Sequence, residues 1–180
     1  NGLLPRVMSG TSAGSIVCGM LGVRTDEELM DMWRDDFSWS KTFSLDFFGD
    51  KDLHRWTRTG EELYSSEHLG KVLRDNIGDY TFLEAFDRTG RIMNITVSGL
   101  PGNTRYPMLL NYLTSPHVLV WSAAQCSASV PGIFSSRELL IKDRHGNIAP
   151  YVSGGLKWQD GSMQSDLPMA RLLGAFHFNY

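Results

Sequence analysis

Residues 6–20 read RVMSGTSAGSIVCGM, and this stretch decides the fold. The apolar run before it predicts a buried strand over about residues 3–8, with Pro5 near its start. The small and uncharged residues over 13–21 predict a helix that lies inside the domain. The stretch therefore predicts a sharp turn from a strand into a helix, with a short polar segment at the turn.

Ser12 lies at this turn, with Gly10 and Gly14 two positions away on either side. Small flanking residues let a strand and a helix approach closely around a nucleophilic serine, whose own backbone is strained. Free N–H groups at the start of the helix stabilise negative charge, and the amide of Ala13 is the expected oxyanion donor. The pattern is also compatible with a phosphate-binding or ordinary turn. A Walker-type P-loop is excluded, because no Lys-Ser/Thr pair follows the glycines.

The rest of the chain alternates helical spacing with β-branched runs. Thr25 with Glu28, and Thr81 with Glu84, are capping-box patterns that begin two helices. The alternation favours an α/β layered fold over a sandwich or a bundle. The other expected elements are helices over 65–78 and 115–129 and after Asp166, strands over 91–99 and 156–160, and a hairpin over 138–152.

The composition narrows the class of protein. The chain has 180 residues, 42% hydrophobic and 21% charged, which suits one globular domain. A net charge of −3 provides no broad basic surface, so we expect no nucleic-acid partner. No apolar run is long enough to span a membrane. Cys18 and Cys126 are expected to be buried thiols in a reducing compartment, and no metal-ligand set is visible, so we expect no metal and no cofactor.

A serine nucleophile needs a base. Of the 5 histidines, His177 alone fits the chain order Ser, acid, His that is typical of α/β-hydrolases. Asp160 is a second candidate, because it ends a predicted strand and precedes Gly161, which places a carboxylate at a sheet edge where ligands bind. Asp-Gly is also a common turn dipeptide. The residues alone do not decide whether His177 or Asp160 is the base, or whether Asp160 and Gly161 form only an ordinary turn.

Three segments in combination resemble the patatin-like lipases: GTSAGS at 10–15, SVPGIF at 129–134 and WQDGSMQSDLPMARL at 158–172. The similarity is closest to the intracellular triacylglycerol lipases of that superfamily, covers most of the chain, and is weakest over 35–60. It implies a patatin-like three-layer α/β/α fold. The start at Asn1 and the apolar end FHFNY predict that residues 1–180 are a partial domain, incomplete at both ends.

The resemblance implies a catalytic dyad, with Ser12 as nucleophile, Asp160 as base, and Gly161 completing the family's Asp-Gly motif. The implied reaction is hydrolysis of fatty-acyl esters of glycerolipids by a triacylglycerol lipase or phospholipase, or acyl transfer to a lysophospholipid. The implied location is inside the cell, bound peripherally at a lipid droplet or endomembrane surface.

The family supplies its oxyanion hole from a Gly-rich loop on an earlier strand. Only eleven residues precede Ser12 here. We therefore expect residues 1–180 alone to hydrolyse esters poorly or not at all. The alternative is a catalytically silent lipid-binding or scaffold domain.

An aromatic-rich region is compatible with an acyl pocket, contact with a lipid surface, or ordinary core packing. Its members are Trp33, Phe37, Trp39, Phe43, Phe47, Phe48 and Trp56.

Overall fold

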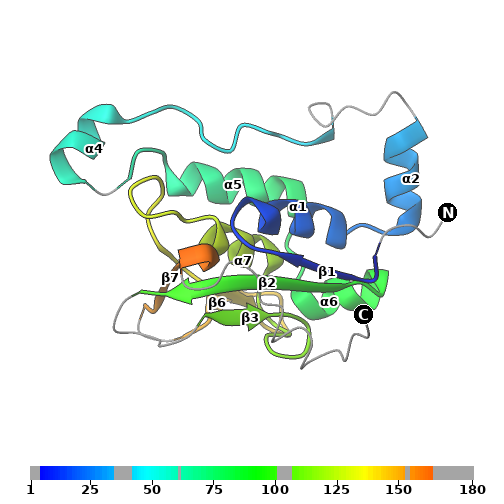
Figure 1. The fold of residues 1–180 in the computed structure, drawn as a ribbon. Coiled ribbons are helices and arrows are strands. Elements are labelled where there is room, and N and C mark those ends of the chain that lie inside the picture. The colour runs from blue at the N-terminus through cyan, green and yellow to red at the C-terminus, as the bar shows by residue number, and fades with distance from the viewer. Residues whose placement is uncertain (1–4, 35–41, 61, 101–106, 153–154, 164–180) are drawn as a thin grey trace.

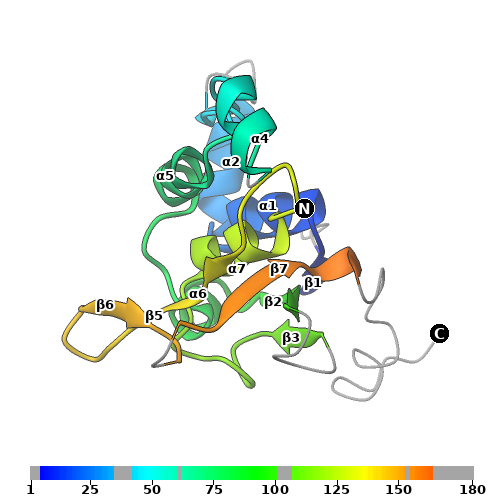
Figure 2. The ribbon, with the colours of Figure 1, turned by 90° about the vertical axis from the view of Figure 1, so that its left-hand side faces the viewer.

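A computed structural model describes residues 5–34, 42–60, 62–100, 107–152 and 155–163. Its centre is a five-stranded sheet with helices stacked on it (Figures 1 and 2). Helices α1 (Ala13–Gly22) and α7 (Val120–Ser127) contact the sheet, and α5 (Ser66–Ile77) packs against α7. The α/β fold expected from the sequence is confirmed.

Strand β2 (Ile92–Gly99) is the central strand and is buried along nearly its whole length. One edge pairs antiparallel with β3 (Met108–Leu110). The other edge holds two strands in succession, β1 (Val7–Gly10), which is parallel to β2, and β7 (Lys157–Asp160), which is antiparallel. Strand β4 (Arg137–Glu138) then pairs with the outer edge of β7.

Strands β1 and β7 run toward each other along β2, so their C-terminal ends meet. Gly10 lies opposite Ile95, and Asp160 lies opposite Val97. Only Thr96 separates the two positions on β2. This register brings together two strand ends that are far apart in the chain, and it fixes where the site forms.

The described residues form three further helices, the last of which also contacts β2. They are α2 (Asp26–Arg34), α4 (Leu53–Thr59) and α6 (Phe82–Thr89). Both expected capping boxes are present. The amide of Thr25 donates to the Glu28 carboxylate at 2.8 Å, and the reciprocal bond is 3.3 Å long. Thr81 and Glu84 make the same pair of bonds at the start of α6.

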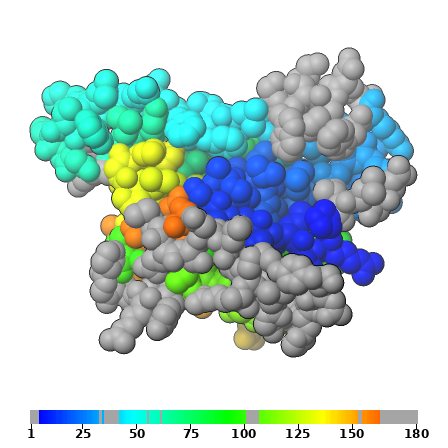
Figure 3. All heavy atoms as spheres, viewed as in Figure 1, coloured from blue at the N-terminus to red at the C-terminus, as the bar shows by residue number. Residues whose placement is uncertain are grey.

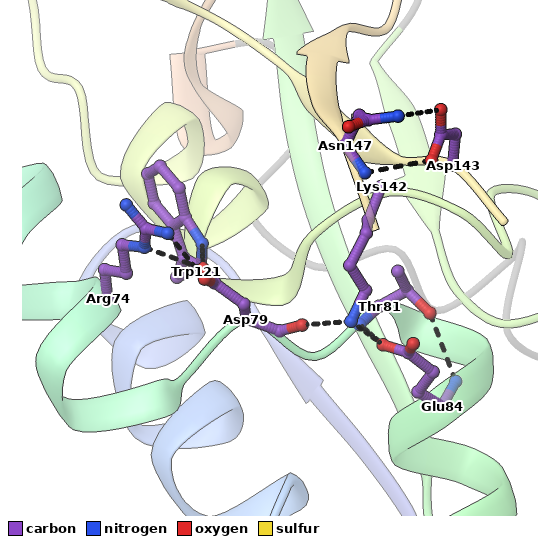
Figure 4. Close-up of polar contacts among 8 residues, drawn as sticks. All are labelled: Arg74, Asp79, Thr81, Glu84, Trp121, Lys142, Asp143 and Asn147. Carbon is purple, nitrogen blue, oxygen red and sulfur yellow. Dashed lines mark hydrogen bonds and ion pairs between the residues drawn. The ribbon is translucent and has the colours of Figure 1, made fainter. Parts of the chain in front are cut away.

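A polar network around Asp79 connects α5, α6, α7 and the following hairpin (Figure 4). The Asp79 carboxylate accepts two hydrogen bonds from Arg74, at 2.8 and 2.6 Å, and one from Trp121 Nε1 at 3.0 Å. Lys142 Nζ donates to the backbone oxygen of Asp79 and pairs with Glu84, both at 2.6 Å. The Arg74 guanidinium, helped by Trp121 and Lys142, lowers the pKa of Asp79.

The expected hairpin is confirmed as β5 (Leu140–Lys142) and β6 (Ile148–Pro150). Two expected boundaries were wrong. Helix α7 begins at Val120 rather than near 115, because Val118 forms a bridge with Ile141 instead. Strand β1 extends to residue 10 because its pairing with β2 continues that far.

Strand β3 was not expected, since its three residues carry no alternation to detect. The helix expected after Asp166 lies outside the described residues.

The core lies between the sheet and its helices, with Ile95, Leu73 and Leu119 inaccessible to solvent. Cys18 and Cys126 are free and buried there, and burial raises the pKa of the Cys18 thiol to about 12. In the part of the chain that the structure describes, no helix has the length and apolar character needed to cross a membrane.

Candidate active site

Ser12 occupies the turn between β1 and α1 in a strained conformation. Its φ of 54° makes it the one non-glycine residue with positive φ among the described residues. Such conformations cost about 1–3 kcal/mol and persist where the surrounding structure enforces them. A Cβ at Gly10 would overlap the carbonyl oxygen of Gly14, and it would lie 2.7 Å from the Cα of Ser15. Gly10 is therefore required for the close crossing of strand and helix.

Gly14 differs from Gly10 although the sequence motif is symmetrical. A Cβ built at Gly14 meets no described atom within 4 Å. Among the described residues, the close approach that the motif predicts therefore depends on Gly10 and not on Gly14.

Asp160 ends β7 with its side chain buried and directed at Ser12. The Ser12 hydroxyl donates to Asp160 Oδ2 at 2.6 Å, a length typical of a hydrogen bond to a charged carboxylate. The amide of Ser162 donates to Oδ1 at 2.8 Å. The Asp160 amide donates to the carbonyl oxygen of Ser129 at 3.0 Å. Both carboxylate oxygens and the backbone amide of Asp160 are thus hydrogen-bonded, which holds the carboxylate against the Ser12 hydroxyl.

Gly161 lets β7 turn away immediately after this carboxylate. A Cβ at Gly161 would overlap the carbonyl oxygen of Thr96 and lie 3.0 Å from the Thr11 methyl group. The Asp-Gly pair expected from the sequence therefore has a steric reason: no side chain fits next to the converging strand ends.

The backbone around Ser12 is held by two other serines. Its carbonyl oxygen accepts the Ser15 amide at 2.9 Å and the Ser15 hydroxyl at 2.6 Å. Its amide donates to the hydroxyl of Ser127 at 3.0 Å. Ala13 is exposed in the first turn of α1, where amides have no acceptor within the helix and the dipole favours negative charge. The expected oxyanion donor therefore lies at the exposed start of a helix, one residue after Ser12.

Ser127 was missed by the sequence reasoning. The signal was a group of small hydroxyl residues at the end of an apolar helix, just before SVPGIF, and such residues are common in helix termini. His177, the alternative base, lies outside the described residues. Within them, no cluster of three or more His, Cys, Asp or Glu side chains is placed to hold a metal ion.

A hollow of about 1000 Å³ lies between α5, α7 and β4, away from the Ser12–Asp160 pair. Charged side chains of both signs line it, and neither Ser12 nor Asp160 reaches it. It is therefore separate from the candidate active site.

Residues 1–173 match the model of the patatin-like phospholipase family. The chain belongs to this family. A patatin-like phospholipase domain-containing protein of Yarrowia lipolytica is 40% identical over 98% of the chain. A triacylglycerol lipase of Arabidopsis thaliana is 38% identical over 99% of the chain. A patatin-like phospholipase domain-containing protein of Aspergillus oryzae is 39% identical over 100% of the chain. The chain spans about a fifth to a quarter of the length of these relatives.

In this patatin-like chain, the structure brings together the residues that the sequence singled out. Ser12 and Asp160 are in direct hydrogen-bond contact, and Gly161 adjoins them. Gly10 makes the close crossing possible, and Ala13 is the first residue of α1, directly after Ser12.

Proposed function

We propose that this chain forms the catalytic centre of a serine lipid acyl hydrolase, with Ser12 as nucleophile and Asp160 as base. The observation that carries the proposal is the 2.6 Å hydrogen bond from the Ser12 hydroxyl to Asp160 Oδ2, made between two strand ends that converge on β2. Membership of the patatin-like phospholipase family supports the same assignment.

Acylation follows from this geometry. The Ser12 hydroxyl passes its proton to Asp160 Oδ2 while its oxygen forms a bond to the carbonyl carbon of a fatty-acyl ester. The carbonyl oxygen becomes anionic, and the amide of Ala13 with the start of α1 stabilises it. The tetrahedral intermediate then breaks its C–O bond to the alcohol. Asp160 returns the proton to the departing alcohol oxygen, which leaves an acyl group on Ser12.

Deacylation reverses these roles. Water gives a proton to Asp160 as the water oxygen attacks the acyl-enzyme carbonyl. The bond between the carbonyl carbon and Ser12 Oγ then breaks as Asp160 passes this proton to Oγ. The products are a free fatty acid and the original enzyme. An alcohol such as a lysophospholipid in place of water would give acyl transfer with the same two residues.

We infer a glycerolipid substrate, with triacylglycerol as the first candidate and phospholipid as the second. The support is the triacylglycerol lipase among the relatives. Release of fatty acid from emulsified triolein and from phosphatidylcholine vesicles, compared at equal accessible lipid, separates the two.

We propose that the protein works inside the cell at the surface of a lipid droplet or endomembrane. Four large apolar side chains support contact with lipid, because Phe48, Leu53, Trp56 and Ile133 are all exposed. In Figure 3 the surface continues from the α4 segment, through the loop after α7, to the turn after β7 beside the start of α1. A lipid surface meeting this side would therefore lie next to Ser12.

Flotation with triolein emulsion coated in phosphatidylcholine tests this contact. Replacing Leu53 and Trp56 by serine is expected to reduce the bound fraction. Replacing Leu113, which is also exposed, by serine is expected to leave it unchanged. Equal binding by both variants would exclude the α4 side as the contact, and fluorescence microscopy of the tagged protein tests the location.

Active-site labelling tests the proposed chemistry. The full-length protein is treated with a fluorophosphonate probe, and a soluble short-chain p-nitrophenyl ester measures turnover. Labelling and turnover are expected in the wild type and are expected to vanish in Ser12→Ala. A wild-type protein that takes no label and releases no nitrophenol would instead favour the silent lipid-binding domain. The buried thiols of Cys18 and Cys126 do not compete for the probe, since burial raises both pKa values.

A further inference from the structure

Ser127 connects the candidate nucleophile to the central strand. It is the last residue of α7 and has no exposed surface. Its hydroxyl donates to the backbone oxygen of Thr96 at 2.7 Å and accepts the amide of Ser12 at 3.0 Å. Thr96 is the β2 residue between the positions opposite Gly10 and Asp160. The Ser127 hydroxyl thus connects the turn between β1 and α1 to the place on β2 where the two strand ends converge.

The hydrogen bond that Ser127 donates to Thr96 is not the one that a serine in a helix usually makes. Serine hydroxyls in helices commonly donate to the carbonyl four residues earlier. Ser129, two residues past the end of α7, makes a bond of this kind to Gln125 at 2.8 Å. Ser127 instead reaches across to β2 and presents its lone pair to Ser12. Because β1 ends at Gly10, the Ser12 amide lies beyond the strand and takes this hydroxyl as its acceptor.

We propose that Ser127 is the positioning residue of the nucleophile: its hydroxyl holds the strained backbone of Ser12 so that the serine Oγ meets Asp160 Oδ2. This inference rests on the proposed hydrolase function. Ser127 touches neither the substrate nor the Asp160 carboxylate. It acts through the Ser12 amide, and it thereby occupies that amide and leaves oxyanion stabilisation on this side to Ala13.

Loss of the hydroxyl has a defined consequence. Without an acceptor for its amide, Ser12 is free to relax from its positive φ, which moves Oγ away from Oδ2. Misplacement of a reacting group by about 1 Å costs about 100-fold in rate. The ground-state binding of an ester does not involve this bond. The expected effect is therefore on kcat and not on KM.

The test compares two serines of the same helix in the full-length protein. Ser122 and Ser127 are both fully buried in α7. The hydroxyl of Ser122 accepts the Leu140 amide at 2.8 Å and makes no contact with Ser12. Turnover of a soluble p-nitrophenyl ester, the rate of fluorophosphonate labelling and Tm are measured for Ser127→Ala and Ser122→Ala.

We expect Ser127→Ala to lower kcat and the labelling rate by about 10- to 100-fold with KM unchanged. Ser122→Ala should lose comparable Tm but keep wild-type kcat. Equal kcat for the two variants, or a Ser127→Ala effect confined to Tm, overturns the inference while leaving the hydrolase function standing. A wild-type protein with neither labelling nor turnover overturns both.

If Ser127→Ala does not fold, the pair Ser127→Cys and Ser122→Cys replaces it. A thiol has similar shape but is a weak donor and acceptor. Reduced kcat in Ser127→Cys alone supports the positioning role, and wild-type kcat in a folded Ser127→Cys overturns it.

Discussion

The hydroxyl of Ser12 donates to Oδ2 of Asp160 at 2.6 Å, although 148 positions separate the two residues in the chain. The contact exists because β1 and β7 occupy the same edge of β2 and run toward each other. Among the described residues no histidine is hydrogen-bonded to either group. The pair therefore forms a two-residue arrangement in which the proposed base is held by β7 and the proposed nucleophile by the turn after β1.

Asp160→Asn is expected to remove the proposed base while keeping the fold. The asparagine oxygen can still accept the Ser162 amide, but the NH2 group now faces the Ser12 hydroxyl and cannot take its proton. General-base catalysis contributes about 100- to 10,000-fold, so kcat for a soluble ester should fall by about that factor. Steady-state kinetics with a p-nitrophenyl ester measures it.

The matched control is Asp143→Asn in the β5–β6 turn. Asp143 accepts hydrogen bonds within its own turn and makes none with Ser12 or Asp160. The kcat of the Asp143→Asn variant should equal that of the wild type. An Asp160→Asn variant that also kept wild-type kcat would remove Asp160 from the proposed mechanism.

Local patterns in the sequence predicted local structure well. The capping boxes at Thr25 and Thr81, the strand that ends at Asp160 and the helix after Ser12 all depend on residues within a few positions of each other. Boundaries failed where distant partners decided them. Val118 leaves the helical pattern because its partner Ile141 comes from the following hairpin.

The site itself was only partly predictable. Local sequence motifs identified Ser12 and Asp160 separately, but the prediction that they pair came from the family resemblance. No local pattern indicates that two strands converge on Thr96. Ser127 could not be found this way, since its role comes from a contact 115 positions away. The GxSxG motif also hides a difference in packing between its two glycines.

That difference predicts opposite outcomes for two alanine variants. A Cβ at Gly10 overlaps the backbone of Gly14, which cannot move without displacing α1, so Gly10→Ala should lower the free energy of unfolding by about 1–3 kcal/mol. Gly14 has open space and lies within the helix, where alanine is favoured over glycine by about 1 kcal/mol. Gly14→Ala should therefore be neutral or stabilising. Urea unfolding of both variants measures this, and equal destabilisation would contradict it.

Glu62 is a buried carboxylate that holds the loop after α7. Its Oε2 accepts the Ser66 hydroxyl at 2.6 Å and the amides of Ser66 and Ser135 at 3.2 and 3.3 Å. Burial alone would raise the pKa of Glu62, but these donors outweigh it and the pKa is lowered. Glu62→Ala leaves buried donors without this acceptor and should cost about 3 kcal/mol.

Glu67→Ala, on the exposed surface of α5, is the control for Glu62→Ala and should change the unfolding free energy by less than about 0.5 kcal/mol. Chemical denaturation compares the two. Similar values would mean that the three hydrogen bonds of Glu62 contribute nothing net to the fold.

The Asp79 network predicts a stability difference that depends on pH. Hydrogen bonds from Arg74 and Trp121 lower the pKa of Asp79 below its ordinary value of 3.8. A carboxyl with a lowered folded-state pKa contributes stability above its ordinary pKa and loses it as the pH falls through the folded-state value. Asp79→Asn should therefore be less stable than the wild type at neutral pH, by about 1 kcal/mol because the pair is partly exposed.

Below pH 3.8 this difference should shrink as the wild-type Asp79 takes up a proton. Urea unfolding of wild type and Asp79→Asn across the acidic range measures the trend. Asp75→Asn, an exposed neighbour on α5, controls for the general loss of a negative charge. Two results would contradict this prediction. In one, the difference in unfolding free energy between wild type and Asp79→Asn stays constant down to the lowest pH. In the other, this difference matches that for Asp75→Asn at every pH, and either result would show that the Asp79 carboxylate does not stabilise the junction of α5, α7 and β5 through its charge.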